Sequence, residues 1–263
     1  MKYCILTPTF RGHFKYLRNY LSSFSKKLED KDNCVFYFIV NDNETREIER
    51  ILINYPELCT RVVTFERILR KFNINISPDN LLNKYGKFSF QALKKFYGML
   101  YLEDYRYFLV LDTESILFRR TSISKAFKQF FFDNPFIIYS NVKSRLLSSE
   151  SNLEASDNIN FIFKSNCDKW FVEQYVRFWD VEILKDLFKE YGSCFDIVNN
   201  IYMKEMEFNP KLGLFESVLY DQFVFEHNNK YKYKLVDLDQ ECSQVFPADV
   251  LSKYREKMAK IWN

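Results

Sequence analysis

The chain has 263 residues, of which 47% are hydrophobic and 28% are charged. A chain of this length can bury a core without disulfides or structural metals, as ordinary globular proteins do. Its 38 basic residues nearly balance its 35 acidic residues, and the net charge of +3 does not indicate a nucleic-acid-binding protein. Because the chain has only two histidines, a site built on three histidines is excluded.

The sequence shows no membrane-spanning or disulfide pattern. No apolar run reaches the roughly 18 residues that a membrane-spanning helix needs, and MKYCILTPTF has the pattern of a first strand rather than of a secretory signal. The six cysteines include no CxxC pair, which argues against a disulfide framework and a structural zinc site. We therefore expect buried thiols in a reducing cytoplasm.

The first half of the chain alternates between two patterns. Short apolar runs predict strands at 3–7, 34–40, 61–66, 107–111 and 135–140. Helical spacing of apolar residues predicts helices at 14–24, 44–54, 91–102 and 123–132. Strands that are apolar on both faces and alternate with helices predict a mainly parallel sheet covered by helices on both sides.

The second half is more mixed. Residues 144–160 are polar and weakly patterned, so we expect a loop or an insertion there. The remaining patterns predict a strand at 169–179, a helix at 181–191 that is N-capped by Asp180, a helix at 215–226 and a strand at 231–238. Without repeats or a linker rich in Gly or Pro, 1–263 is expected to form one α/β domain, with halves at 1–140 and 141–263.

Polar residues follow three of the predicted strands. Ligands of parallel α/β sheets bind beyond the carboxyl ends of the strands. That rule places the 7–9, 41–42 and 112–114 segments along one edge and predicts a shared crevice.

Asp112 and Glu114 are two residues apart in an extended segment, so both carboxylates can approach one cation. Carboxylate oxygens suit Mg²⁺ or Mn²⁺, which take their other ligands from phosphates and water. In the alternative interpretation, Asp112 merely ends a strand and Glu114 is a solvated turn residue.

The segment FLVLDTES resembles the D-x-D motif of glycosyltransferases of the GT-A fold. The resemblance implies a Rossmann-type, mainly parallel sheet flanked by helices, with a mixed acceptor-side region after residue 140. It implies metal-dependent transfer of a sugar from a nucleotide-sugar donor, UDP-linked, to a glycan acceptor in surface polysaccharide (capsule or lipopolysaccharide) biosynthesis. Asp112 and Glu114 would hold Mn²⁺ or Mg²⁺, and Asp112 and Thr113 would contact the sugar nucleotide.

Two further segments carry the resemblance. ILTPTFRGHFKYLRNYLSSF is similar to the opening strand and helix of that fold, in which Thr7, Pro8 and Thr9 would line the nucleotide pocket. YFIVNDNE resembles its second strand and places Asp42 where an acidic residue often contacts the base or ribose.

A Q-x-x-K segment lies before the acidic triplet. In several bacterial GT-A-like families such segments touch the donor or its phosphates, which implies this role for Gln91 and Lys94. Cations at this place, including Lys95, would offset diphosphate charge. A solvated helix face is the alternative interpretation.

GLFESVLYDQFVFEHN is similar to an acidic F-x-E-x-x-L-Y helix near the acceptor in GT-A-like bacterial enzymes. An inverting transfer needs a general base, for which Glu216 is the first candidate and Asp221 the second. A helix-start residue favoured by the dipole is the alternative for Glu216. His227 would be a third metal ligand, as a late His is in some members of the fold; a structural role is the alternative.

Two aromatic segments admit two interpretations each. Trp170, Trp179 and Asp180 could bind a sugar by ring stacking and carboxylate hydrogen bonds, or pack in the core. The amphipathic tail at 251–263 could contact an anionic membrane surface on the inner face of the cell membrane, or cap the domain's own core.

Three other functions remain as alternatives. A haloacid-dehalogenase-like phosphatase also ends an apolar strand in an Asp, but its D-x-D-x-T/V pattern normally follows the first strand. A non-catalytic nucleotide- or glycan-binding module would bind UDP without turnover. A nucleotidyltransferase would carry a Gly-rich basic loop after the first strand, and residues 7–12 contain one Gly only.

Overall fold

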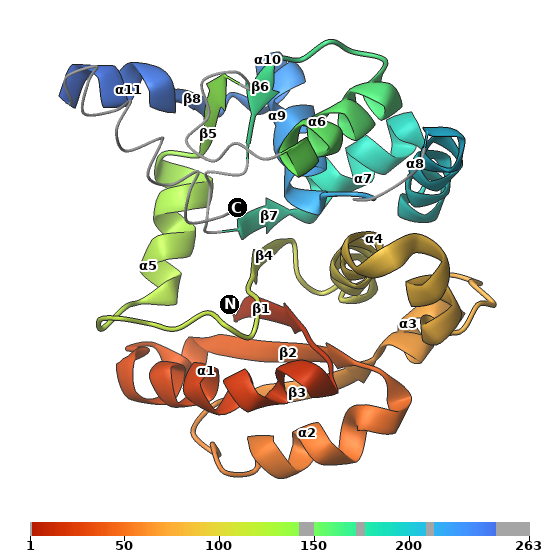
Figure 1. The fold of residues 1–263 in the computed structure, drawn as a ribbon. Coiled ribbons are helices and arrows are strands. Elements are labelled where there is room, and N and C mark those ends of the chain that lie inside the picture. The colour runs from red at the N-terminus through yellow and green to blue at the C-terminus, as the bar shows by residue number, and fades with distance from the viewer. Residues whose placement is uncertain (1, 142–149, 172–176, 209–212, 246–263) are drawn as a thin grey trace. The chain divides into compact units, whose positions relative to one another are not determined.

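The computed structural model describes residues 2–141, 150–171, 177–208 and 213–245. Contacts within the chain divide it into two units (Figure 1). The first unit comprises Met1–Asp133 and Val176–Asp186, and the second comprises Asn134–Tyr175 and Leu187–Asn263. Each unit is described by itself, and the predicted organisation as one domain stays a prediction.

The first unit is built on a five-stranded sheet with the strand order β3-β2-β1-β4-β7. Its strands are β1 (Tyr3–Pro8), β2 (Cys34–Val40), β3 (Thr60–Thr64), β4 (Tyr107–Val110) and β7 (Arg177–Asp180). The first four are parallel, and β7 pairs with β4 in the antiparallel direction at the edge. The predicted, mainly parallel sheet is therefore confirmed.

Helices cover both faces of this sheet (Figure 1). They are α1 (Phe14–Lys27), α2 (Thr45–Leu52), α3 (Phe65–Lys71), α4 (Pro78–Tyr101) and α5 (Ile123–Lys128). On one face, Tyr20 of α1 packs against Phe36 and Phe38 of β2. On the other, Gly98 of α4 approaches Leu6 and Ile39 so closely that a Cβ atom would meet the Ile39 side chain. Successive side chains of a strand point to opposite faces of the sheet, so they pack against helices on opposite sides.

Two boundaries in this unit differ from the predicted ones. The strand predicted at 61–66 ends at Thr64, because the Thr64 hydroxyl caps α3 by accepting a hydrogen bond from Arg67 N (3.4 Å). The helix predicted at 91–102 already begins at Pro78, after the capping residue Ser77. Gly86, with a φ of 75°, kinks it, and this break hid the first half of the helix from the apolar periodicity.

The second unit contains a three-stranded sheet with the order β6-β5-β8. Its strands are β5 (Phe136–Asn141), β6 (Lys169–Trp170) and β8 (Lys234–Asp237), and its helices are α6 (Glu150–Phe163), α8 (Cys194–Phe208), α9 (Glu216–Glu226), α10 (Asn228–Tyr231) and α11 (Leu238–Val245). The helix α7 (Val181–Tyr191) contributes residues to both units. β5 was predicted as the fifth strand of the parallel sheet and belongs to this smaller sheet instead.

Two other predictions in this region are wrong. The expected loop at 144–160 contains most of α6, whose buried residues Ala155, Ile159 and Phe163 recur every four positions among polar neighbours. The expected strand at 169–179 is two short strands, β6 and β7, in different sheets. Residues 142–149 and 172–176 lie outside the described residues, as does the tail at 251–263.

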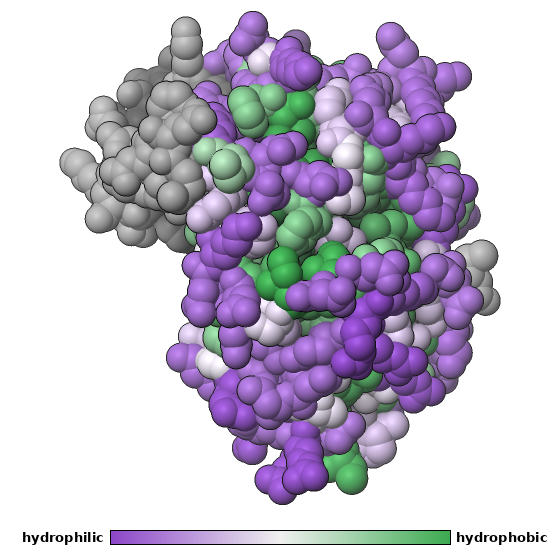
Figure 2. Space-filling view, turned by 90° about the vertical axis from the view of Figure 1, so that its right-hand side faces the viewer, coloured by the Kyte–Doolittle hydropathy of each residue, from purple (hydrophilic) through white to green (hydrophobic). Residues whose placement is uncertain are grey.

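The surface agrees with the composition. The face shown in Figure 2 is mostly hydrophilic, and most large apolar side chains are buried. None of the helices in the described ranges combines the length and the apolar character needed to cross a bilayer. The five cysteines whose side chains are described, Cys4, Cys34, Cys59, Cys167 and Cys194, form no disulfide with one another.

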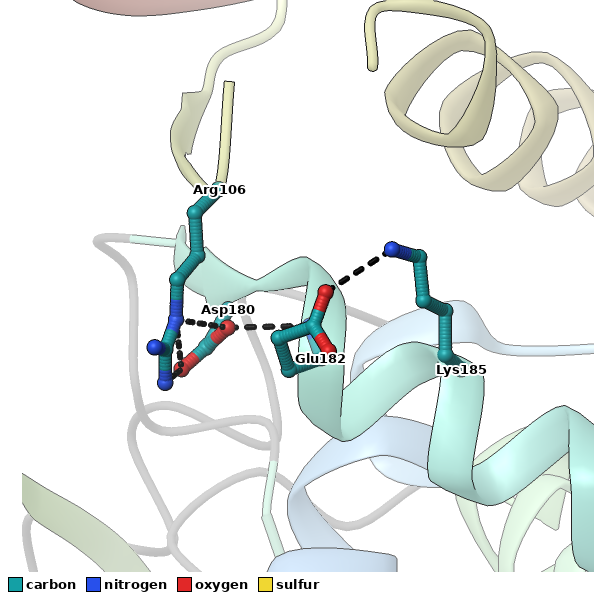
Figure 3. A network of polar contacts seen from close by, with 4 residues as sticks. All are labelled: Arg106, Asp180, Glu182 and Lys185. Carbon is teal, nitrogen blue, oxygen red and sulfur yellow. Dashed lines mark hydrogen bonds and ion pairs between the residues drawn. The ribbon is translucent and has the colours of Figure 1, made fainter. Parts of the chain in front are cut away.

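Asp180 joins β4 to the start of α7 (Figure 3). Its Oδ1 accepts hydrogen bonds from Glu182 N (2.9 Å) and Arg106 Nε (3.1 Å), and its Oδ2 accepts one from Arg106 Nη2 (2.8 Å). The predicted N-cap is therefore confirmed. The neighbouring Trp179 is buried against Phe96, with ring centroids 5.4 Å apart. Asp180 and Trp179 thus have the structural contacts that the core-packing interpretation expects.

Replacing Asp180 by alanine is expected to lower the free energy of unfolding by about 2 kcal/mol, since it removes a buried cap and the partner of Arg106. The half-exposed Arg106 keeps this below the usual value for a buried pair. Glu182→Ala is the matched control: it leaves the Asp180 cap in place, removes the exposed ion pair with Lys185 (2.8 Å) and should cost less than about 0.5 kcal/mol. Urea unfolding of both variants measures the difference, and equal losses would contradict the assignment.

Candidate functional site

The carboxyl ends of β1, β2 and β4 meet at one edge of the parallel sheet. β1 lies between the other two strands. Beyond its end, Thr9 N donates a hydrogen bond to Ile39 O of β2 (2.9 Å), while Leu111 N donates one to Leu6 O of β1 (2.9 Å). The three polar segments that follow these strands are therefore neighbours, as the strand-end rule predicts.

The buried carboxylate of Glu44 fastens two of these segments together. Its Oε1 accepts a hydrogen bond from Arg11 N (2.7 Å), and its Oε2 accepts one from Asn41 N (3.0 Å). A carboxylate that receives two backbone N–H groups is charge-stabilised where it is buried. Glu44 thus holds the loop after β1 against the loop after β2.

A cavity of about 400 Å³ opens at these strand ends, and we call it the strand-end pocket. It is lined by Pro8, Thr9, Phe10, Arg11, Asn41, Asn43, Glu44, Asp79, Leu82, Lys87, Phe90, Gln91 and Lys94. Its walls combine the rings of Phe10 and Phe90 with amides, carboxylates and a buried cation. Among the residues that the structure describes, the buried Thr9 hydroxyl has no hydrogen-bond partner. Such a mixture is typical of pockets for small polar ligands that have a flat apolar part.

Lys94 is the buried cation of the strand-end pocket and is only 2% exposed. Its Nζ donates to Thr9 O (3.3 Å) and lies over the rings of Phe90 (4.8 Å) and Phe65 (5.6 Å). Burial lowers the pKa of Lys94 to about 8, against an opposing contribution from Glu44 and Glu66. At neutral pH the pocket therefore contains a charged ammonium group that contacts aromatic rings and a carbonyl oxygen instead of water.

The structure separates the residues predicted to bind the nucleotide into two groups. Pro8, Thr9, Gln91 and Lys94 line the strand-end pocket. Thr7 does not, because its hydroxyl is buried in contact with Tyr20 Oη (3.0 Å).

Asp42 is also absent from the pocket lining, which its neighbours Asn41, Asn43 and Glu44 provide. Its backbone N donates to Glu66 Oε2 (3.0 Å), and its side chain is exposed. A nucleotide contact by Asp42 stays a prediction.

The acidic triplet follows β4 and is flanked by two basic side chains. Asp112 Oδ1 lies 3.3 Å from Nζ of the buried Lys95, and Glu114 Oε1 lies 3.2 Å from His13 Nδ1. Between them, the buried Thr113 hydroxyl contacts His13 Nδ1 (3.4 Å). The two carboxylates are 59% and 47% exposed, so both are open to a ligand.

The donor set at the triplet suits a hard divalent cation. Two accessible carboxylates supply oxygen ligands, and Mg²⁺ or Mn²⁺ ordinarily completes its coordination with phosphate oxygens and water. Within the described ranges, no three His, Cys, Asp or Glu side chains are grouped so that they could hold a metal by themselves. Asp112 and Glu114 thus fit a cation that is shared with a phosphorylated ligand.

The predicted acceptor-side residues lie on or after α9 in the second unit. Every residue from Glu216 to Val224 is buried, so Glu216 and Asp221 belong to a helix that is enclosed on all sides. Glu216 lies near Cys194, whose thiol pKa is raised mainly by burial and to a smaller extent by this carboxylate. Their catalytic roles stay predictions.

His227 follows the end of α9. Its Nδ1 contacts Phe223 O (3.0 Å), and its Nε2 lies 3.3 Å from Glu190 Oε2. Both ring nitrogens thus have protein partners within the second unit, and metal binding by His227 stays a prediction.

Sequence reasoning missed two residues that shape the site: His13 contacts the triplet, and Glu44 joins two strand ends. Lys95 was expected to offset diphosphate charge, but its pairing with Asp112 was not expected. The K-K pair at 94–95 was a usable signal, because one lysine enters the pocket and the next reaches the triplet. For His13 and Glu44 the sequence holds no comparable signal, since their roles depend on how α1 and α2 begin.

No protein-family model and no curated protein sequence matches the chain. Solved structures do match it. Mouse xyloside xylosyltransferase 1, in its apo form, is 12% identical, with a TM-score of 0.52 over 90% of this chain and 85% of that chain. Core-mannan synthase A from Aspergillus fumigatus, in an Mn/GDP form, is 9% identical, with a TM-score of 0.50 over 85% of this chain and 69% of that one.

At these identities the likeness concerns the fold. The neighbours share with this chain a mixed α/β arrangement in which a central, mostly parallel sheet is flanked by helices. The chain therefore has a GT-A-like, Rossmann-type fold, with the strand-end pocket and the acidic triplet at the carboxyl edge of its parallel sheet.

Proposed function

We propose that this protein is a metal-dependent glycosyltransferase. It moves a sugar from a nucleotide-sugar donor, UDP-linked, to a hydroxyl of a glycan acceptor in surface-polysaccharide biosynthesis. One observation carries the proposal. The strand-end pocket, with its polar and aromatic walls, and the accessible acidic triplet lie at the same edge of the parallel sheet. The similar folds of a xylosyltransferase and of a mannan synthase in an Mn/GDP form add support to this proposal.

In this proposal the strand-end pocket takes the nucleoside. Phe10 and Phe90 offer aromatic surface to a base, and the Thr9 hydroxyl and the Asn41 and Asn43 side chains offer polar partners. Lys94 then faces the negatively charged part of the ligand from a water-poor position, where a charge-assisted hydrogen bond is strong. Asp42 and Thr113 are additional donor contacts in the proposal.

Asp112 and Glu114 would hold Mn²⁺ or Mg²⁺, which supplies Lewis-acid stabilisation of the departing diphosphate. The chain's own contribution is positioning: Lys95 and His13 keep the two carboxylates in place before the ligand arrives. The haloacid-dehalogenase alternative requires Asp112 as a nucleophile, and its ion pair with Lys95 gives no specific support to that role.

The proposed general base belongs to the second unit. Glu216, or Asp221, serves as the base that takes the acceptor proton, and His227 is a candidate for a further metal ligand. A cytoplasmic location and contact of the 251–263 tail with the inner face of the membrane belong to the same proposal.

A thermal-shift screen tests donor and metal together. UDP-sugars with Mn²⁺, at about 100 times the dissociation constant, should raise Tm by about 5–10 °C, because a ligand that binds only the native state stabilises it by about 2.7 kcal/mol. GDP- and CDP-sugars serve as comparison nucleotides, and each is measured with and without Mn²⁺. An unchanged Tm with every nucleotide sugar, in either metal condition, would exclude the proposed function.

A further inference from the structure

A second cavity adjoins the acidic triplet, and it shares no lining residue with the strand-end pocket. It has a volume of about 560 Å³ and lies between one face of α1 and the segment that follows β4. Tyr16, Asn19, Ser22 and Lys26 mark the face of α1 that lines it, at steps of three or four residues. Thr113 and Glu114 line it too, so this cavity, which we call the α1 groove, shares two residues with the triplet.

The two ends of the α1 groove differ in charge. Glu114 lies beside His13 at the start of α1, while Lys26 and Lys27 belong to the last turn of that helix. Lys27 Nζ donates to Phe118 O (2.9 Å), and neither lysine forms an ion pair with a carboxylate in the described part of the chain. From Tyr16 to Lys26 the helix advances by about 15 Å, at 1.5 Å per residue. The groove therefore suits an elongated ligand that carries negative charge at one end only.

The middle of the groove fits a saccharide. Tyr16 and Ile116, which are 37% and 43% exposed, offer apolar surface to the faces of sugar rings. Asn19 and Ser22 offer hydrogen bonds to hydroxyl groups. Pockets that combine a few apolar surfaces with separate polar groups orient their ligands in this way.

We propose that the α1 groove binds the glycan acceptor, and that this acceptor carries an anionic group, a carboxylate or a phosphate, near Lys26 and Lys27. The inference rests on the proposed function, because it places the reacting hydroxyl of the acceptor at the Thr113–Glu114 end of the groove. It adds the chemical class of the acceptor, which is an acidic oligosaccharide, and the surface that recognises it.

Direct binding tests the inference without turnover. Isothermal titration of the full chain with a glucuronate-containing tetrasaccharide, a phosphorylated disaccharide and the neutral cellotetraose compares the two anionic sources with an uncharged glycan. At least one acidic probe should bind about tenfold more tightly than the neutral probe, and raising the salt concentration should weaken its binding.

Lys26→Glu should reduce binding of the acidic probe by about tenfold or more, because it reverses an exposed charge without disturbing packing. Arg18→Glu is the matched control, since Arg18 is also exposed on α1 but does not line the groove. Lys26→Gln removes the charge without reversing it and should lose less affinity for the acidic probe. This second variant keeps the test decisive if the reversed charge of Lys26→Glu perturbs α1. Equal affinities of the three variants for the acidic probe, or no binding of any acidic probe, would overturn the inference.

UDP with Mn²⁺ separates this inference from the proposed function. Lys26→Glu should bind UDP as the unaltered protein does, since the strand-end pocket does not include Lys26. If UDP still binds and glycan binding does not depend on Lys26, only the assignment of the α1 groove as the acceptor site is overturned. Lys26-dependent glycan binding without any UDP binding supports the groove and overturns the transferase.

Discussion

Asp112→Ala is expected to lower metal-dependent hydrolysis or transfer from a UDP-sugar by at least about 100-fold. Removing an oxygen ligand weakens the metal that stabilises charge on the leaving group, and electrostatic contributions of this kind are worth several kcal/mol. Asp112 follows directly after β4 and Leu111, and its carboxylate is 59% exposed, so it is open to a metal ion. Initial rates at fixed donor concentration, with Mn²⁺ or excess chelator, measure the effect.

Two comparisons make this result specific. Glu114→Asp should retain activity while Glu114→Ala loses it, because the shorter acid still supplies oxygen ligands. Asp104→Ala, which removes an exposed acid elsewhere in the first unit, should leave the rate unchanged. Full activity of the Asp112→Ala protein in excess chelator would rule out the metal-dependent mechanism.

The ion pair between Asp112 and the buried Lys95 adds a stability readout. Both Asp112→Ala and Asp112→Asn remove the negative partner, so both are expected to lower Tm at neutral pH. If the two variants melt alike, a larger loss of turnover in one of them reports on ligand binding and not on folding.

The sheet edge was predictable because its strands are apolar on both faces and end abruptly in polar residues. Thr9, Asn41 and Asp112 each mark such an end, and the strand-end rule for parallel sheets brings them together without knowledge of side-chain contacts. Thr9, which lines the strand-end pocket, follows from the same rule, whereas Lys94 was expected from the resemblance of the Q-x-x-K segment.

The remaining features depend on packing that no periodicity records. In the sequence, Glu44 is one of several charged residues at the start of a predicted helix. In the structure, its buried carboxylate accepts hydrogen bonds from the loop after β1 and from the loop after β2. In α6, polar residues outnumber the buried Ala155, Ile159 and Phe163, so its helical period was obscured. β5 has the same apolar pattern as the strands of the parallel sheet, and its pairing with β6 and β8 assigns it to the second sheet. The role of Glu44, the formation of α6 and the sheet to which β5 belongs all depend on contacts with residues distant in the sequence.

Lys94→Met is expected to raise the free energy of unfolding at pH 7 by about 1–2 kcal/mol while weakening UDP binding by about tenfold or more. The gain arises because methionine fills a similar volume between Phe65 and Phe90 without a charge to desolvate. The loss arises because the pocket then lacks its buried cation. Chemical denaturation and UDP titration of the same protein measure the two effects.

The pH dependence of stability gives this prediction its sign. In the folded protein Lys94 has a pKa of about 8, against 10.5 for an unperturbed lysine. Between these values the unfolded chain binds more protons, so the stability of the unaltered protein should rise with pH from about 8 to 10.5, relative to Lys94→Met. Below pH 8 both states are protonated, and the full cost of burying the charge remains. Over the same interval UDP affinity should fall as free Lys94 loses its proton.

Lys87→Met is the matched control, since Lys87 also lines the strand-end pocket but is exposed. Its stability and its pH profile should follow those of the unaltered protein. If Lys94→Met were less stable than the unaltered protein and bound UDP equally well, Lys94 would be a structural residue. A more stable variant with weaker UDP binding would mean that the fold keeps a destabilising buried cation for its ligand, even though that cation donates a hydrogen bond to Thr9 O.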